Sequence, residues 1–141
     1  MITLTQFRAA TGSSAVAAAR HMAAAVGAMQ MFGITSKLAI AAFLANMCHE
    51  TLDLIYMQEL WGPTKAQRRY EPPSTLATKL GNNRLGDGRR YMGRGPTQLT
   101  GRANYRRATV DLRAKFPALG VPDFEAAPDK AAEPQWGWLI A

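Results

Sequence analysis

The stretch SKLAIAAFLANMCHET at residues 36–51 tells most about the fold of this 141-residue chain. Its apolar side chains follow the 3.6-residue period of a helix with one buried face, at Ile40, Leu44, Met47 and Cys48. Thr35 or Ser36 can cap the start of this helix, and the apolar pattern stops near Glu50 or Thr51. The stretch therefore predicts a half-buried helix whose last turn carries a glutamate.

The chain on either side of this stretch predicts a mainly α fold. An Ala-rich segment follows the capping residues 11–14, residues 100–115 predict a later helix, and residues 136–141 read as the start of a buried one. Residues 54–60 are compatible with a short strand, and residues 62–90 are rich in Pro, Gly, Asn and Arg. We interpret residues 62–90 as a long irregular loop, and such loops in compact domains are usually functional or mobile.

Composition fits one globular domain over residues 1–141. The net charge is +7, and residues 65–115 hold thirteen Lys and Arg against three Asp and Glu. A basic face of this kind favours a polyanionic partner, such as a bacterial wall, a nucleic acid or an anionic lipid surface. The single cysteine, Cys48, is expected to be buried as a small apolar residue, and we expect no cofactor.

Sequence signals for export and membrane insertion are lacking. No apolar run reaches the roughly 18 residues that a membrane-spanning helix needs. The N-terminus lacks the basic, apolar and small-residue order of a cleaved signal. We therefore expect synthesis in the cytoplasm without a signal peptide, no stable membrane insertion, and any action on a cell wall only after release through another protein's pore.

Glu50 is the first candidate for catalysis. A carboxyl at the end of a helix that packs on the core is expected to be partly desolvated, which raises its pKa. A raised pKa keeps a general acid protonated near neutral pH. A glutamate at a helix end is nevertheless more often a solvated or paired residue, so Glu50 needs a partner.

Glu59 lies nine residues further on and can be that partner. On one continuous helix the two carboxyl groups would point to opposite faces, about 13 Å apart along the axis. If the helix stops near Thr51 and the chain doubles back, Glu59 can face Glu50 across a cleft. Two carboxyl groups across a cleft are the minimum equipment for glycoside hydrolysis.

The segment YMGRGPTQLTGRANY at residues 91–105 strengthens this interpretation. Glycines on both sides of Arg94 let the backbone approach a ligand closely. Gln98 and Thr100 alternate, so on an extended segment they point the same way, and Asn104 lies one helical turn beyond Thr100. Hydroxyl and amide groups in this arrangement suit a sugar and a water molecule, although the same glycines could serve a phosphate- or RNA-binding loop.

Together these motifs resemble the family 19 glycoside hydrolases, which include chitinases of the class I type and phage endolysins. The resemblance rests on His49-Glu50-Thr51, on Glu59 and on the 91–100 segment, and residues 60–64, 86–88 and 100–105 are more similar to the endolysin branch. The family implies a lysozyme-like α+β fold with a small β-hairpin and a long loop region beside the cleft. It also implies bacteriolytic cleavage of β-1,4 bonds with inversion, through a water nucleophile.

The resemblance also implies a role for each matching residue. Glu50 is expected to be the general acid and Glu59 the general base, while Thr100 helps to hold the attacking water. The remaining matches are expected to bind substrate, with Arg94 bracing the cleft: His49, Tyr91, Arg94, Gln98 and Asn104. Leu52-Asp53 stands where the family usually has Gly-Gly, and the family's C-terminal part does not follow residue 141. The chain thus resembles a C-terminally truncated family member.

Several functions remain open on the sequence. The expected partner of this glycosidase is peptidoglycan glycan, with a chitin-like oligosaccharide as the alternative, and we expect a monomer. A metal enzyme is disfavoured because the chain has two histidines and no spaced ligand set. A nucleic-acid binder would use the arginines of residues 89–107 on phosphates, but Glu50 and Glu59 close to that patch disfavour it. A non-catalytic wall-binding module is the third possibility.

Overall fold

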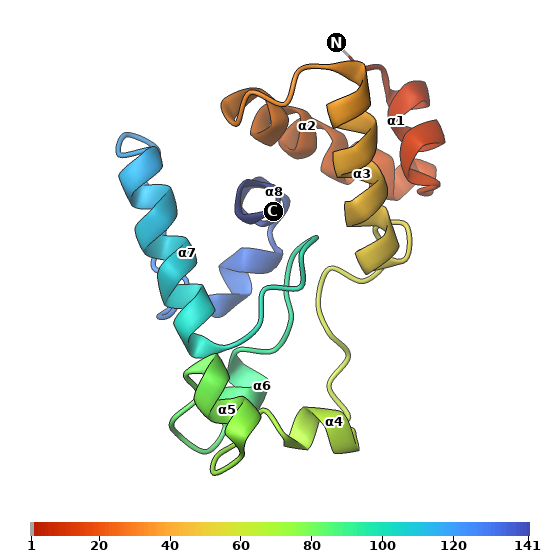
Figure 1. The fold of residues 1–141 in the computed structure, drawn as a ribbon. Coiled ribbons are helices and arrows are strands. Elements are labelled where there is room, and N and C mark those ends of the chain that lie inside the picture. Colours follow the sequence, from red (N-terminus) through yellow and green to blue (C-terminus); the bar gives the residue numbers. More distant parts are fainter. Residues whose placement is uncertain (1) are drawn as a thin grey trace.

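The protein is described by a computed structural model covering residues 2–141, and helices joined by loops make up most of it (Figure 1). In chain order the helices are α1 (Leu4–Thr11), α2 (Ala15–Met31), α3 (Lys37–Thr51), α4 (Lys65–Arg68), α5 (Thr75–Leu80), α6 (Asp87–Arg90), α7 (Arg102–Lys115), the 3-10 helix η1 (Pro128–Ala132) and α8 (Pro134–Ile140). The prediction of a mainly α fold is confirmed.

Short polar residues start most of these helices. The Ser36 hydroxyl accepts a hydrogen bond from the Ala39 N–H and so caps α3, as its sequence predicts. Helices α1 and α4 both begin with a capping box, in which a threonine and a glutamine three residues later bond to each other's backbone N–H. Local sequence therefore sets where these helices begin.

Helix α3 has the predicted length and the predicted buried face. It ends at Thr51, and Leu44, Met47 and Cys48 are buried on its inner side. Burial, with a contribution from nearby Asp53, raises the pKa of the Cys48 thiol to about 11. Cys48 therefore stays protonated at neutral pH, and the prediction that it is a buried apolar residue is confirmed.

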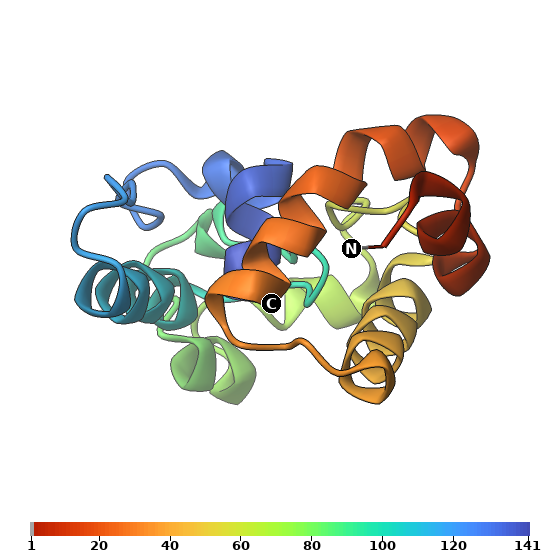
Figure 2. The ribbon, with the colours of Figure 1, turned by 90° about the horizontal axis from the view of Figure 1, so that it is seen from above.

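Helix α8 forms the centre of the core. It lies between the N-terminal helices and α7 and packs against α2, α7 and η1 (Figures 1 and 2). Trp138 on α8 is 1% exposed, and its indole N–H donates to Nδ1 of buried His21 at 3.2 Å. The apolar run near residue 140 thus does form a buried helix, because α2 and α7 supply its partners.

Two predictions about the middle of the chain are wrong. No β-hairpin forms within residues 2–141: isolated antiparallel bridges pair Gln58 with Arg94 and Arg94 with Leu99. Left-handed φ angles at Leu52, Asp53 and Leu54 replace the start of the expected strand by a turn. Residues 62–90 are not wholly irregular either, since they contain α4, α5 and α6.

None of the helices in residues 2–141 is long and apolar enough to cross a membrane.

Candidate active site

Glu59 lies in the loop that joins α3 to α4 and is half-buried. Hydrogen bonds from two other segments hold its carboxylate in place. The Glu59 N–H donates to the Gly93 carbonyl at 2.8 Å, and the Gly93 N–H donates to Glu59 Oε2 at 3.0 Å. The Gln67 amide donates to the other oxygen, Oε1, at 3.0 Å. Since each carboxylate oxygen has two acceptor positions, each keeps one for water or substrate.

Gly93 also brings two other predicted site residues close to this carboxylate. A Cβ at position 93 would lie 2.6 Å from Gln98 Oε1 and 3.3 Å from Thr100 Oγ1. Only glycine leaves room for both side chains against the backbone whose N–H holds Glu59. The structure thus gathers Glu59, Gln98 and Thr100 around one glycine, from sequence positions up to 41 apart.

Gln98 and Thr100 do lie on the same side of their segment, but the segment is not extended as the sequence predicts. Gln98 has a φ of 51°, in the left-handed region, and its amide donates to the carbonyls of Tyr56 and Gly95 at 3.2 and 3.1 Å. The Thr100 hydroxyl donates to the Gln98 carbonyl at 2.7 Å. Its oxygen therefore keeps lone pairs that can accept a hydrogen bond from a water molecule.

Asn104 lies where helical periodicity predicts, one turn after Thr100. Its side-chain amide donates to the Thr100 carbonyl at 2.7 Å, and the residue is exposed on the first turn of α7. The amide oxygen remains free to accept a hydrogen bond from a sugar hydroxyl. This hydrogen bond to the Thr100 carbonyl therefore fixes the Asn104 side chain relative to Thr100.

Glu50 and His49 occupy the last turn of α3, and both are exposed. The expected partial burial of Glu50 is wrong, because α3 packs only its opposite face on the core. Neither side chain has a hydrogen-bond or ion-pair partner within residues 2–141. In that same part of the chain, no three His, Cys, Asp or Glu side chains gather as a metal ion would require.

The chain does turn back directly after Glu50, as the two-carboxylate hypothesis needs. Leu52, Asp53 and Leu54 have φ angles of 48°, 58° and 67°. Each left-handed non-glycine residue costs about 1–2 kcal/mol, so this turn is strained. It directs residues 57–59 alongside residues 93–95, where the Gly95 N–H donates to the Met57 carbonyl at 2.9 Å.

Tyr91 and Arg94 are placed beneath the candidate site. Tyr91 is 1% exposed, and its hydroxyl donates to the Glu125 carbonyl at 3.1 Å. Arg94 is 4% exposed, and its guanidinium donates to the Tyr105 hydroxyl at 3.0 Å and to Asp129 at 2.8 Å. In this arrangement both side chains support the 91–100 segment from inside, and their roles toward a substrate stay predictions.

Gln67 is a site residue that the sequence interpretation missed. It lies in the 62–90 segment that composition marked as irregular, yet it is 4% exposed and contacts Glu59 directly. A local signal was present, because Thr64-Lys65-Ala66-Gln67 matches the capping-box pattern of a helix start. That pattern predicts a helix at this point but not the contact with Glu59.

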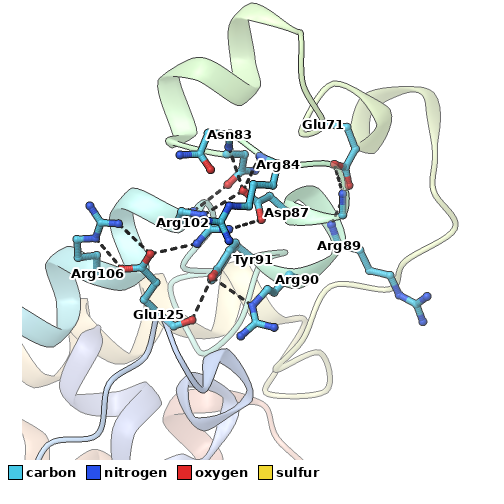
Figure 3. A network of polar contacts seen from close by, with 12 residues as sticks. Glu71, Asn83, Arg84, Asp87, Arg89, Arg90, Tyr91, Arg102, Arg106 and Glu125 are labelled. Atoms are coloured by element: carbon cyan, nitrogen blue, oxygen red, sulfur yellow. Dashed lines mark hydrogen bonds and ion pairs between the residues drawn. The ribbon is translucent and has the colours of Figure 1, made fainter.

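An ion-pair network fastens the two ends of the 91–101 segment (Figure 3). Arg102 at the start of α7 pairs with Asp87 on α6 at 2.5 Å and with Glu125 at 3.1 Å. Arg106 pairs with the other side of the Glu125 carboxylate at 2.6 Å. The hydrogen bond from Arg106, assisted by Arg102, lowers the pKa of Glu125 to about 2. Because α6 precedes this segment and α7 follows it, the network holds its ends together.

A cavity of about 720 Å³ opens beside this network. Arg84 and Arg90 are among the residues that line it, and Arg89 is the neighbour of Arg90 on α6 (Figure 3). These three arginines are exposed, and within residues 2–141 none of their guanidinium groups forms an ion pair with a carboxylate. Part of the basic charge seen in the sequence is thus available to an anionic partner.

Comparison with known proteins gives one informative similarity. No protein-family model matches the chain. The chain is 36% identical over 104 residues to Chitinase 6 from Oryza sativa subsp. japonica. The match covers 70% of this chain and 35% of the rice protein, so the chain spans about a third of the length of that relative.

Proposed function

We propose that this chain is the catalytic unit of an endolysin-type member of the family 19 glycoside hydrolases, which cleaves β-1,4 bonds in the glycan of peptidoglycan. The observation that carries the proposal is the Glu59 carboxylate held at Gly93, beside the Thr100 hydroxyl and the Gln98 amide. Similarity to a protein named as a chitinase supports the same class of reaction.

In the proposed reaction Glu50 donates a proton to the leaving glycosidic oxygen while Glu59 takes a proton from a water molecule. Hydrogen bonds to Glu59 and Thr100 orient the water molecule. It attacks the anomeric carbon on the face opposite the leaving group, which inverts the configuration of that carbon. An inverting pair needs its carboxyl groups roughly 6.5–9.5 Å apart to admit that water. Gln98 and Asn104 bind the sugar, and His49 contacts it from the end of α3.

Peptidoglycan is proposed as the substrate because the wall is anionic and the protein is basic. The exposed guanidinium groups of Arg84, Arg89 and Arg90, near the 720 Å³ cavity, form no ion pair within residues 2–141 and can meet an anionic wall. The proposed enzyme needs no cofactor, acts as a monomer, and reaches the wall through another protein's pore. A chitin-like oligosaccharide is the second candidate, favoured by the name of the rice relative.

The test is the release of reducing ends from purified peptidoglycan sacculi and, in parallel, from chitin oligosaccharides. Glu50→Gln and Glu59→Gln should each lower the rate by about 100-fold or more, the usual contribution of a general acid or base. Asp111→Asn, which removes an exposed carboxylate on α7, is the matched control and should leave the rate unchanged.

The outcomes separate the candidate functions. Reducing ends from sacculi, with inversion seen by NMR of the fresh product, support the endolysin proposal. Hydrolysis confined to chitin oligosaccharides supports the chitinase alternative. Binding to sacculi with no bond cleavage contradicts the enzymatic proposal and supports a wall-binding module.

A further inference from the structure

The side chain of Gln67 has an environment that a helix cap alone does not need. It is 4% exposed on α4, and every hydrogen-bonding position of its amide faces a protein partner. Its NH2 group donates to Glu59 Oε1 at 3.0 Å and to the Leu60 carbonyl at 2.8 Å. Its oxygen accepts from the N–H groups of Gly62 and Thr64 at 3.1 and 2.7 Å.

These four partners determine which way the amide faces. Two backbone N–H groups surround one end of it and two acceptor oxygens surround the other. Turning the amide over would bring its NH2 group against two donors and its oxygen against two acceptors. The network therefore presents an N–H donor, and never an acceptor, to the Glu59 carboxylate.

We propose that Gln67 is a positioning residue for catalysis, whose amide holds one oxygen of the Glu59 carboxylate so that the group stays aimed at the reacting water. A donated hydrogen bond stabilises the ionised form of a carboxylate, which is the form that a general base needs. The Gly93 N–H holds the second oxygen, so the two donors together fix the plane of the carboxylate. This inference rests on the proposed role of Glu59 as the base.

The capping box at the start of α4 offers a clean way to separate capping from positioning. Gln67→Glu keeps a side-chain oxygen for the Gly62 and Thr64 N–H groups, and glutamate is as common as glutamine in this motif. It replaces the NH2 donor that faces Glu59 by a second carboxyl oxygen. Two carboxyl groups at that distance share a proton, so Glu59 should ionise at higher pH.

A matched control exists in α1. Thr3 and Gln6 form the same capping box, with the Gln6 oxygen accepting from the Thr3 N–H at 2.9 Å, and within residues 2–141 the Gln6 NH2 group donates to no carboxylate. Gln6→Glu therefore makes the same chemical change in the same motif without touching the site. It should leave both catalysis and its pH dependence as in the unsubstituted protein.

The experiment measures kcat/KM against pH on the substrate that the unsubstituted protein hydrolyses. For Gln67→Glu we expect kcat/KM at pH 6 to fall by about 10-fold or more and the acid limb of the profile to move up by about 1 pH unit or more. The thermal unfolding temperature should fall below that of the Gln6→Glu protein, because the new carboxyl is buried and also faces the Leu60 carbonyl, so both variants are compared at a temperature where each remains folded. A profile identical to that of Gln6→Glu would overturn the proposal and leave Gln67 as a cap alone.

A second measurement needs no activity. NMR with 13C-labelled glutamate follows the Glu59 carboxyl carbon against pH in the substrate-free protein, assigned with Glu59→Gln. The midpoint of that titration should rise in Gln67→Glu and remain unchanged in Gln6→Glu. Absence of hydrolysis by the unsubstituted protein contradicts the proposed function, whereas an unmoved midpoint in Gln67→Glu contradicts the role of Gln67.

Discussion

The two candidate catalytic carboxylates lie in contrasting surroundings. Glu59 is half-buried and receives hydrogen bonds from Gln67 and from the Gly93 backbone, which lie far from each other in sequence. Glu50 is exposed on the last turn of α3 and is followed by three left-handed residues. Tertiary contacts fix the first carboxylate, whereas a helix end and a strained turn place the second.

This difference indicates which contacts hold the candidate site in a defined geometry. The base of the proposed mechanism must hold one geometry, and hydrogen bonds fix the carboxylate of Glu59, its candidate. A proton donor at the end of a helix can approach its substrate by small movements of that helix end. We therefore expect the Glu59 region to be sensitive to packing changes and the Glu50 region to be tolerant of them.

The largest expected change in the free energy of unfolding comes from a substitution that disrupts the packing next to the Glu59 region. Gly95 has a φ of 74°, and a Cβ there would lie 2.9 Å from the Ala131 carbonyl oxygen, a backbone atom that cannot move aside. Gly95→Ala should lower the free energy of unfolding by about 3 kcal/mol, from left-handed strain plus overpacking. The measurement is urea denaturation followed by circular dichroism.

Gly33→Ala is the control for that substitution. Gly33 has nearly the same φ, 71°, but a Cβ there would meet nothing within 4 Å. It should cost only the backbone strain, about 1 kcal/mol. Equal losses for the two variants would mean that the contact between Gly95 and Ala131 is not tight, which contradicts a rigidly packed Glu59 region.

An intermediate effect is expected from acid. Glu125 has its pKa lowered to about 2 in the folded protein, chiefly by its hydrogen bond with Arg106, against an ordinary value of 4.5. Its contribution to stability is therefore complete above about pH 4.5 and is lost as pH falls toward 2. After allowance for solvent screening we expect a loss of about 1–2 kcal/mol, measured by urea denaturation at pH 5 and pH 2.5.

Glu125→Gln should remove the part of the stability loss between pH 5 and pH 2.5 that comes from protonation of Glu125. Glu133→Gln, which removes an exposed pair with Lys130, is the matched control and should keep it. At pH 2.5, amide hydrogen exchange should become faster in residues 91–101 before it does at the end of α3, because the ion-pair network of Glu125 fastens only residues 91–101. Simultaneous loosening of both regions would mean that the ion-pair network does not hold residues 91–101 selectively.

The smallest expected effect lies on the Glu50 side. Leu52 is 66% exposed with a φ of 48°, so Leu52→Gly removes strain at the cost of little packing. We expect a gain of about 1 kcal/mol in the free energy of unfolding. Ile55 is 67% exposed without a positive φ, and Ile55→Gly should instead lose about 0.5–1 kcal/mol. A loss of stability in Leu52→Gly would show that the turn is not strained.

The local features of the fold could be predicted because short-range physics sets them. The period of apolar residues fixed the length and buried face of α3, and a serine before it marked its start. The helix stop after Glu50 and the alignment of Asn104 with Thr100 follow from the same rules. The expected hairpin failed because Leu52, Leu54 and Gln98 adopt positive φ angles, which leucine and glutamine rarely take.

The sequence by itself determined the longer helices α2, α3 and α7, the burial of Cys48 and the candidate residues for its chemistry. Only the tertiary structure decided how those residues meet. It placed Glu59 against Gly93, added Gln67 from a segment that composition marked as loop, and left Glu50 exposed. The physical reason is that capping and periodicity act within a few residues, whereas a hydrogen bond between positions 59 and 93 depends on the whole chain's packing.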